Sequence, residues 1–167
     1  MSETKTPIKT INGHALVDTE GRAKIAELSE EMADYGATPE SFGAVGDGVA
    51  DDTEAVRRAL DTGQCLLSKQ YRITSRIDVS NDCVLTGNGT LVVDSATFGI
   101  VFAGKRTVIE NINVVIAPNL LYYAFWLREC TNVTISGVTV NGQGIMPCGR
   151  GFDVFRCEEC DTVHVSD

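Results

Sequence analysis

Polar and apolar residues alternate along four short segments in the second half of the chain. The segments begin at Cys83, Thr107, Val133 and Val163, and in each of them a Gly, Asn or Asp follows where the chain can bend. Such alternation is typical of β-strands, because successive side chains of a strand point to opposite faces. We therefore expect strands to dominate from Cys65 onward.

The four segments recur at steps of 24, 26 and 30 residues. A drifting period in this range is typical of solenoids in which loops of variable length join the coils. The last two copies match over a longer stretch, since 125–133 parallels 155–163 and makes Cys130 equivalent to Cys160. Stacked coils place equivalent positions above one another, so we expect these thiols to form part of an interior ladder. From spacing alone, a sandwich or barrel is the alternative fold.

The first part of the chain has a different pattern. Residues 1–17 are expected to form an extended arm, and 18–40 a helical neck. Within the neck, apolar residues recur at spacings of three, four and three, as in the seam of a coiled coil. Either self-association or packing on its own domain would bury this seam, and the pattern does not decide between them. The seam residues are Ile25, Leu28, Met32 and Tyr35.

A tight turn and a short helix are expected between Ser41 and Leu60, because three glycines precede a run with helix-start signals. Asp51 and Glu54 have the spacing of a capping box, and Gly63 is expected to end the helix. The acidic residues of this segment could also bind a metal or transfer protons. We favour turn and cap roles for them, and expect no metal and no cofactor.

Composition excludes several functions. The formal charge is −9, whereas a nucleic-acid surface needs clustered Lys and Arg. No apolar run is long enough to span a membrane, and the polar N-terminus lacks the apolar region of a signal peptide. We therefore expect synthesis in a cytoplasm, where disulfides are disfavoured. The Cys157–Cys160 pair lacks the second pair that completes most zinc sites, so buried free thiols are favoured.

The run 41–55 resembles the opening motif of the pectate-lyase-like β-helix superfamily, and 130–137 is similar to the coil repeats of these proteins. The resemblance implies a right-handed parallel β-helix over 41–167, with a short helix that caps the first coil. It does not specify a reaction. The motif residues, to which it gives a structural role, are Phe42, Gly43, Gly46, Asp47, Gly48, Asp51, Asp52 and Glu54.

Residues 9–13, together with Leu16, resemble a short element near the N-termini of bacteriophage tail-fibre and tailspike proteins. This resemblance implies a homotrimer made in the host cytoplasm and located in the phage tail of the virion. It also implies that the arm docks on a phage baseplate or tail protein. The β-helix would bind bacterial surface polysaccharide, and many similar proteins also cleave it. A cellular lyase or glycoside hydrolase with the same fold is the alternative.

Candidate chemistry within the chain is sparse. The chain stops at Asp167 inside an expected strand, so we expect a longer polypeptide with any catalytic residues beyond this point, and none here. The densest aromatic group could serve as a platform for sugar rings, with two side chains facing outward, but core packing or a trimer contact is favoured. Its members are Tyr122, Tyr123, Phe125 and Trp126.

Overall fold

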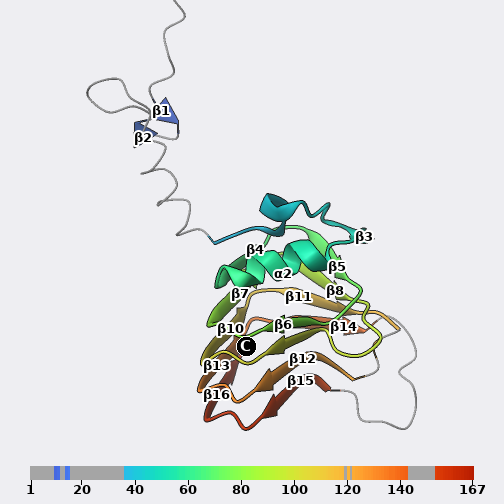
Figure 1. The fold of residues 1–167 in the computed structure, drawn as a ribbon, viewed down its shortest axis with the longest axis vertical. Coiled ribbons are helices and arrows are strands. Elements are labelled where there is room, and N and C mark those ends of the chain that lie inside the picture. Colours follow the sequence, from blue (N-terminus) through green and yellow to red (C-terminus); the bar gives the residue numbers. More distant parts are fainter. Residues whose placement is uncertain (1–9, 12–13, 16–35, 119, 121, 143–152) are drawn as a thin grey trace, which may run out of the picture. The chain divides into compact units, whose positions relative to one another are not determined.

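The computed structural model describes residues 10–11, 14–15, 36–118, 120, 122–142 and 153–167 (Figure 1). The chain divides into two units, Met1–Tyr35 and Gly36–Asp167. In the first unit, strands β1 (Thr10–Ile11) and β2 (His14–Ala15) form an antiparallel pair. The seam residues Ile25, Leu28, Met32 and Tyr35 lie outside the described residues, so the neck stays a prediction.

The described part of the second unit contains one α-helix, α2 (Thr53–Asp61), the 3₁₀ helix η1 (Pro39–Phe42) and three parallel sheets. The first sheet contains β4 (Gln64–Leu67), β7 (Cys83–Gly87), β10 (Arg106–Glu110), β13 (Asn132–Ser136) and β16 (Thr162–Ser166). The second contains β3 (Asp47–Asp51), β5 (Gln70–Ile73), β8 (Thr90–Val93), β11 (Asn113–Ile116) and β14 (Thr139–Gly142). The third contains β6 (Ile77–Val79), β9 (Ile100–Phe102), β12 (Tyr123–Arg128) and β15 (Asp153–Glu158).

From β4 onward the chain visits the three sheets in rotation. Each strand pairs with the strand three places later, and all of these pairs are parallel. Figure 1 shows the resulting levels stacked one below another beneath α2. The arrangement is mainly β and is compatible with a parallel β-helix.

The register confirms the repeat that the sequence predicted. Thr107 pairs with Cys83 on one side and with Val133 on the other, and Val133 pairs with Val163. In the third sheet Phe125 pairs with Phe155, again at the predicted step. The drifting steps therefore come from connections of different length between strands that stay in register.

The core lies between the three sheets and consists of stacked inward side chains. Cys65, Leu85, Ile109 and Ile135 are in register on four successive strands of the first sheet, and all four are buried. Burial of such side chains is the main favourable contribution to folding, at about 25 cal/mol per Å² of apolar surface. The row continues to Val165 on β16, which is 72% exposed.

Cys65, Cys83 and Cys130 follow the same inward pattern, but the prediction of buried thiols is wrong for Cys157, which is exposed on the last strand of the third sheet. Cys130 is buried, as the ladder prediction requires, and Cys160 is partly buried against the core. Burial raises the pKa of the Cys130 thiol, and it raises that of Cys83 to about 12. Thiols that stay protonated at neutral pH are poor nucleophiles and metal ligands, which favours the packing role.

Helix α2 covers the first level of the sheets. Its buried face contacts β4, β5, β6 and β7 and consists of Ala55, Val56, Ala59 and Leu60. The predicted apolar face is thus confirmed, but the capping box is wrong. Asp52 is the N-cap residue, and the Glu54 carboxylate binds Arg57 instead of the helix start. The segment predicted as a tight turn also contains strand β3, which pairs with β5 across a register shift.

Candidate functional site

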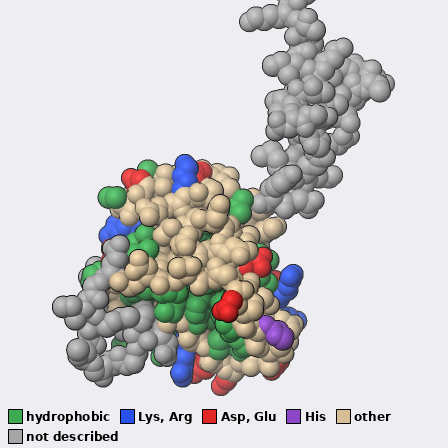
Figure 2. Space-filling model, turned by 180° about the vertical axis from the view of Figure 1, so that it is seen from behind, with side chains coloured by type: hydrophobic (Ala, Val, Ile, Leu, Met, Phe, Trp, Pro, Cys, Tyr) green, Lys and Arg blue, Asp and Glu red, His purple; other side chains and the backbone are tan. Residues whose placement is uncertain are grey.

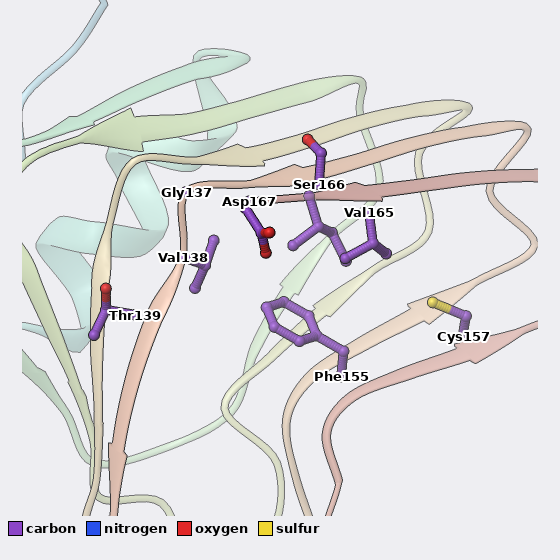
Figure 3. A pocket seen from close by; sticks show the side chains of 9 residues that line it. Gly137, Val138, Thr139, Phe155, Cys157, Val165, Ser166 and Asp167 are labelled. Carbon is purple, nitrogen blue, oxygen red and sulfur yellow. The ribbon is translucent and has the colours of Figure 1, made fainter.

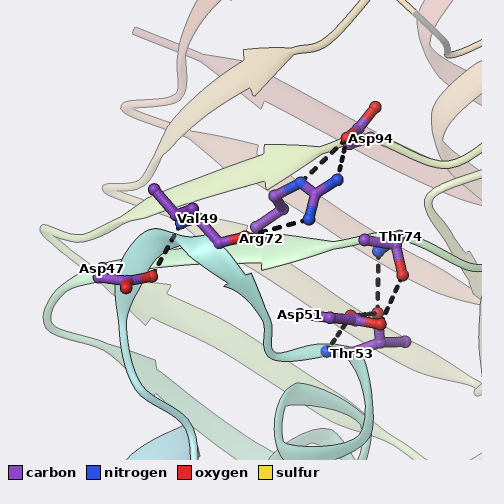
Figure 4. Close-up of polar contacts among 7 residues, drawn as sticks. All are labelled: Asp47, Val49, Asp51, Thr53, Arg72, Thr74 and Asp94. Atoms are coloured by element: carbon purple, nitrogen blue, oxygen red, sulfur yellow. Dashed lines mark hydrogen bonds and ion pairs between the residues drawn. The ribbon is translucent and has the colours of Figure 1, made fainter.

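The acidic residues before α2 form local hydrogen bonds that shape this end of the sheets (Figure 4). The Asp47 carboxylate accepts hydrogen bonds from the Val49 and Ala50 amides, both at 2.8 Å. The Asp51 carboxylate accepts from the Thr53 amide at 3.0 Å and from the Thr74 hydroxyl at 2.6 Å. These bonds connect β3, the start of α2 and the end of β5.

Asp52 and Arg72 complete this arrangement. The Asp52 side chain is only 3% exposed and accepts hydrogen bonds from the amides of Val45, at 2.8 Å, and Gly46, at 3.1 Å. The Arg72 guanidinium binds the Asp94 carboxylate at 2.6 Å and the Val49 carbonyl oxygen at 3.0 Å. A buried carboxylate such as that of Asp52 is retained only when it is hydrogen-bonded. Its bonds to the amides of Val45 and Gly46 hold the segment before β3.

The electrostatics of these carboxylates do not favour acid catalysis. Hydrogen bonds from the Ala50 and Val49 amides lower the pKa of Asp47. Burial acts in the opposite direction on Asp51, but hydrogen bonds from Thr53 and Thr74 outweigh it, and the pKa of Asp51 is lowered too. A general acid at neutral pH needs a raised pKa. Within the described residues, no three His, Cys, Asp or Glu side chains are grouped as metal ligands would be.

A second polar cluster joins η1 to the sheets around the buried Tyr71 ring. The Tyr71 hydroxyl donates to the Glu40 carboxylate at 2.7 Å, and the Lys69 ammonium lies 3.3 Å from the same carboxylate. Burial tends to raise the pKa of Glu40, but the hydrogen bond from Tyr71 and the nearby Lys69 give a net lowering. The ionised form of Glu40 therefore stabilises the folded chain.

This cluster predicts a pH dependence. Because the pKa of Glu40 is lower in the folded chain, its contribution is full above the unfolded pKa of 4.5 and is lost as pH falls through the folded pKa. We expect urea unfolding at pH 7, 5, 4 and 3 to show a steeper acid loss in the wild type than in Glu40→Gln. Glu110→Gln, on β10 and outside the cluster, is the matched control. Parallel pH profiles for the wild type and Glu40→Gln would contradict the assignment.

A cluster of aromatic side chains, called here the aromatic patch, lies on the outer face of the third sheet. It consists of Phe98, Tyr122, Tyr123 and Trp126. The Phe98 ring centroid is 5.1 Å from that of Tyr122, 5.9 Å from Tyr123 and 4.9 Å from Trp126. Tyr122 is 37% exposed, and the other three are partly buried. Aromatic pairs at such distances stabilise one another beyond their burial.

The patch differs from the predicted aromatic group in two ways. Phe125 faces inward, where it is fully buried between Phe102, at 6.4 Å, and Phe155, at 5.0 Å. Three of the four predicted residues therefore face outward instead of two, because Ala124 and Phe125 are both buried and break the alternation. Phe98 was missed. The register of Ile100 with Phe125 places it beside Tyr123, a relation that only the pairing of the coils shows.

Charged side chains border the aromatic patch. The guanidinium of Arg128 lies 4.8 Å from the Trp126 ring centroid, and that of Arg156 lies 6.0 Å from the Tyr123 centroid. The Trp126 indole N–H donates to the Glu158 carboxylate at 3.1 Å. Cation–π contacts and this hydrogen bond hold the rings in place, and they put donors and acceptors at the edge of the patch.

A pocket of about 470 Å³ lies at the opposite end of the stack from α2 (Figure 3). Residues of the last two levels line it, among them Ile135 and Val138 on one level and Phe155 and Val165 on the next. Figure 2 shows hydrophobic side chains exposed on the lower half of one face, among scattered charged ones. The pocket is lined mainly by side chains of the core type, so its chemistry indicates packing and not catalysis.

Comparison with known proteins shows a weak similarity to a phage protein. No protein-family model matches the chain. The chain is 28% identical over 67 residues to the pre-neck appendage protein of Bacillus phage B103. The match covers 39% of this chain and only 8% of that relative. Among the described residues, no helix is long and apolar enough to cross a membrane.

Proposed function

We propose that the chain is part of a phage tail appendage and contributes the first levels of a right-handed parallel β-helix. The similarity to a phage pre-neck appendage protein is the observation on which this proposal rests. Three parallel sheets in rotation, covered at one end by α2, support it, because this is the order that the pectate-lyase-like motif implies. We assign the chain to the virion, in the tail.

The proposal gives each part of the chain a role. Residues 1–17 are the arm that docks on a phage baseplate or tail protein, and the seam from Ile25 to Tyr35 belongs to a neck that joins three copies. The β body of 41–167 belongs to an appendage that attaches the phage to bacterial surface polysaccharide. We assign no catalytic residue within this chain, since the carboxylates of Asp47, Asp51 and Asp52 all bind local partners. We propose depolymerisation only for the appendage as a whole and not for the residues of this chain.

Virion location is the direct test. We expect mass spectrometry of purified phage particles to detect the protein, and antibodies against the chain to label the tail in immunogold micrographs. Antibodies against a major capsid protein provide the control for particle recovery. Detection in uninfected cells, with none in purified particles, would overturn the proposal and favour the cellular carbohydrate-active enzyme.

The trimer is tested separately in solution. We expect sedimentation equilibrium of the chain to give three times its mass of 18.0 kDa. The double variant Leu28→Asp, Met32→Asp places charge in the seam and should yield monomers, because a and d positions of a coiled coil must be apolar. The double variant Ala26→Asp, Ala33→Asp, which places the same charge at b positions away from the seam, is the control. A monomeric wild type at high concentration would contradict a neck that joins three copies.

A further inference from the structure

Backbone hydrogen bonds between the two segments that carry the rings fix the position of the aromatic patch. The Gly99 amide donates to the Tyr123 carbonyl oxygen at 3.0 Å, and the Tyr122 amide donates to that of Thr97 at 3.2 Å. These two bonds extend the pairing of β9 with β12 back to Phe98. A Cβ atom at Gly99 would lie 2.3 Å from the Ala124 carbonyl oxygen, so the two coils are in close contact here. The rings are thus positioned before any ligand arrives, which lowers the entropic cost of binding.

The floor of the patch is apolar and closed. Val101 pairs with Trp126 in the third sheet. It lies between the inward Ile100 and Phe102, so its side chain faces outward, yet Val101 is only 3% exposed. Outer positions of a sheet in water are usually polar and exposed. Here the outer face instead carries a covered Val and four aromatic rings, so it has the composition of a binding surface.

The edge of the patch carries both donors and acceptors. Arg76 lies with its guanidinium 5.7 Å from the Phe98 centroid and pairs with Asp78. Arg128 and Glu158 border Trp126. Protein–protein interfaces are enriched in aromatic and Arg side chains but depleted of Asp and Glu, whereas the edge of this patch carries Asp78 and Glu158. The carboxylates and the net charge of −9 argue against a nucleic-acid strand.

We propose that the aromatic patch is a saccharide-binding subsite, an inference that rests on the proposed attachment function. A sugar ring has apolar C–H faces and a rim of hydroxyl groups. Its faces match the rings of Tyr122 and Trp126, and its hydroxyls match the guanidinium and carboxylate groups at the edge. The subsite spans two levels of the sheets, because Phe98 comes from the connection before β9 while the other rings belong to the β12 segment. A chain of sugars crossing the levels could therefore contact it without entering a closed pocket.

The wild-type chain contains its own reporter, since Trp126 is its single tryptophan. We would titrate it with hexasaccharides of glucose, N-acetylglucosamine and galacturonate, and with oligosaccharides from bacterial capsules and lipopolysaccharide. At least one should shift the tryptophan emission saturably and protect the indole from quenching by acrylamide. If none of these saccharides changes the emission or the quenching, the inference fails.

Variants that keep the reporter locate the site. Tyr122→Ala and Phe98→Ala should each weaken the binding of the active saccharide by about tenfold, as loss of a stacking ring does at other binding sites. Val115→Ala, on the outer face of β11 in the second sheet, is the matched control and should bind as the wild type does. Circular dichroism of each variant identifies any loss of folding, and the less buried Tyr122 keeps the test valid if Phe98→Ala does not fold.

Two further results would overturn the inference. Equal binding by Tyr122→Ala, Phe98→Ala and the wild type would place the saccharide elsewhere. A fall in oligomer mass on Tyr122→Ala, with no saccharide bound by the wild type, would make the patch an interface between copies of the chain. Neither result affects the immunogold test, so failure of the subsite is distinguishable from failure of the proposed virion location.

Discussion

Replacing Phe125 with Ala is expected to lower the free energy of unfolding by about 3–5 kcal/mol. The phenyl ring is fully buried and lies between the rings of Phe102 and Phe155, so its removal leaves a cavity that two neighbouring levels share. The third sheet is rigidly paired on both sides of β12, and this limits how far the cavity can collapse. Urea unfolding followed by circular dichroism measures the loss.

Two further variants test whether the loss comes from the buried position of the Phe125 ring. Phe125→Leu retains most of the apolar volume and should lose about 1–2 kcal/mol. Phe98→Ala removes the same side chain from the outer face, where the ring is only partly buried, and should lose about 1 kcal/mol. If Phe98→Ala cost as much as Phe125→Ala, the assignment of Phe125 to the interior and Phe98 to the surface would be wrong.

Replacing Gly87 with Ala is expected to destabilise the chain by about 3 kcal/mol or more. Gly87 ends β7 with a φ of 122°, a backbone conformation that residues with a Cβ atom rarely adopt. An added Cβ would lie 2.1 Å from the Leu67 carbonyl oxygen and 2.9 Å from the Leu67 amide nitrogen. Both are backbone atoms of the paired strand β4, so relief would require the two strands to separate.

Gly43→Ala is the control that separates the two causes. Gly43 also has a positive φ, of 95°, but nothing lies within 4 Å of the position that its Cβ would occupy. The free energy of unfolding of Gly43→Ala should therefore fall only by the cost of a positive φ for a residue with a Cβ atom, about 1–2 kcal/mol. The difference between the two variants in chemical denaturation reports the close approach of β4 and β7. Equal losses would show that these strands are not as close as their register requires.

The periodic part of the fold could be predicted because it depends on local alternation repeated along the chain. The starts at Cys83, Thr107, Val133 and Val163 are exact partners in the first sheet, and the buried position of Cys130 follows from the same repeat. Each coil must bury the same face against its neighbours, so equivalent positions keep equivalent chemistry. Loops of different length change the step but leave the register intact.

The polar contacts before α2 could not be predicted in the same way. Capping-box spacing suggested that Asp51 and Glu54 bind each other's backbone, but Asp52 is the N-cap, and its carboxylate binds the amides of Val45 and Gly46. Several short polar residues compete for the same role, and the choice depends on how the preceding segment folds back. Spacing in the sequence does not contain that information.

The aromatic patch shows the same division at the candidate site. Three of its rings lie within five residues of one another and were visible in the sequence, whereas Phe98 belongs to the preceding level. Its contacts with Tyr122 and Trp126 exist only because Gly99 and Tyr123 pair across two coils. Tyr123 faces outward because the two residues that follow it, Ala124 and Phe125, are both buried and break the alternation.

The sequence by itself determined the strands of the first sheet, the steps at which they repeat and the positions that are in register on them, because alternation and period are properties of the chain. Only the tertiary structure decided which side chains meet outside this repeat. It brought Phe98 to Trp126, turned Phe125 into the core and directed the Asp52 carboxylate to the amides before β3. These choices follow from packing and hydrogen-bond satisfaction among residues distant in sequence, and they depend on the register of the coils.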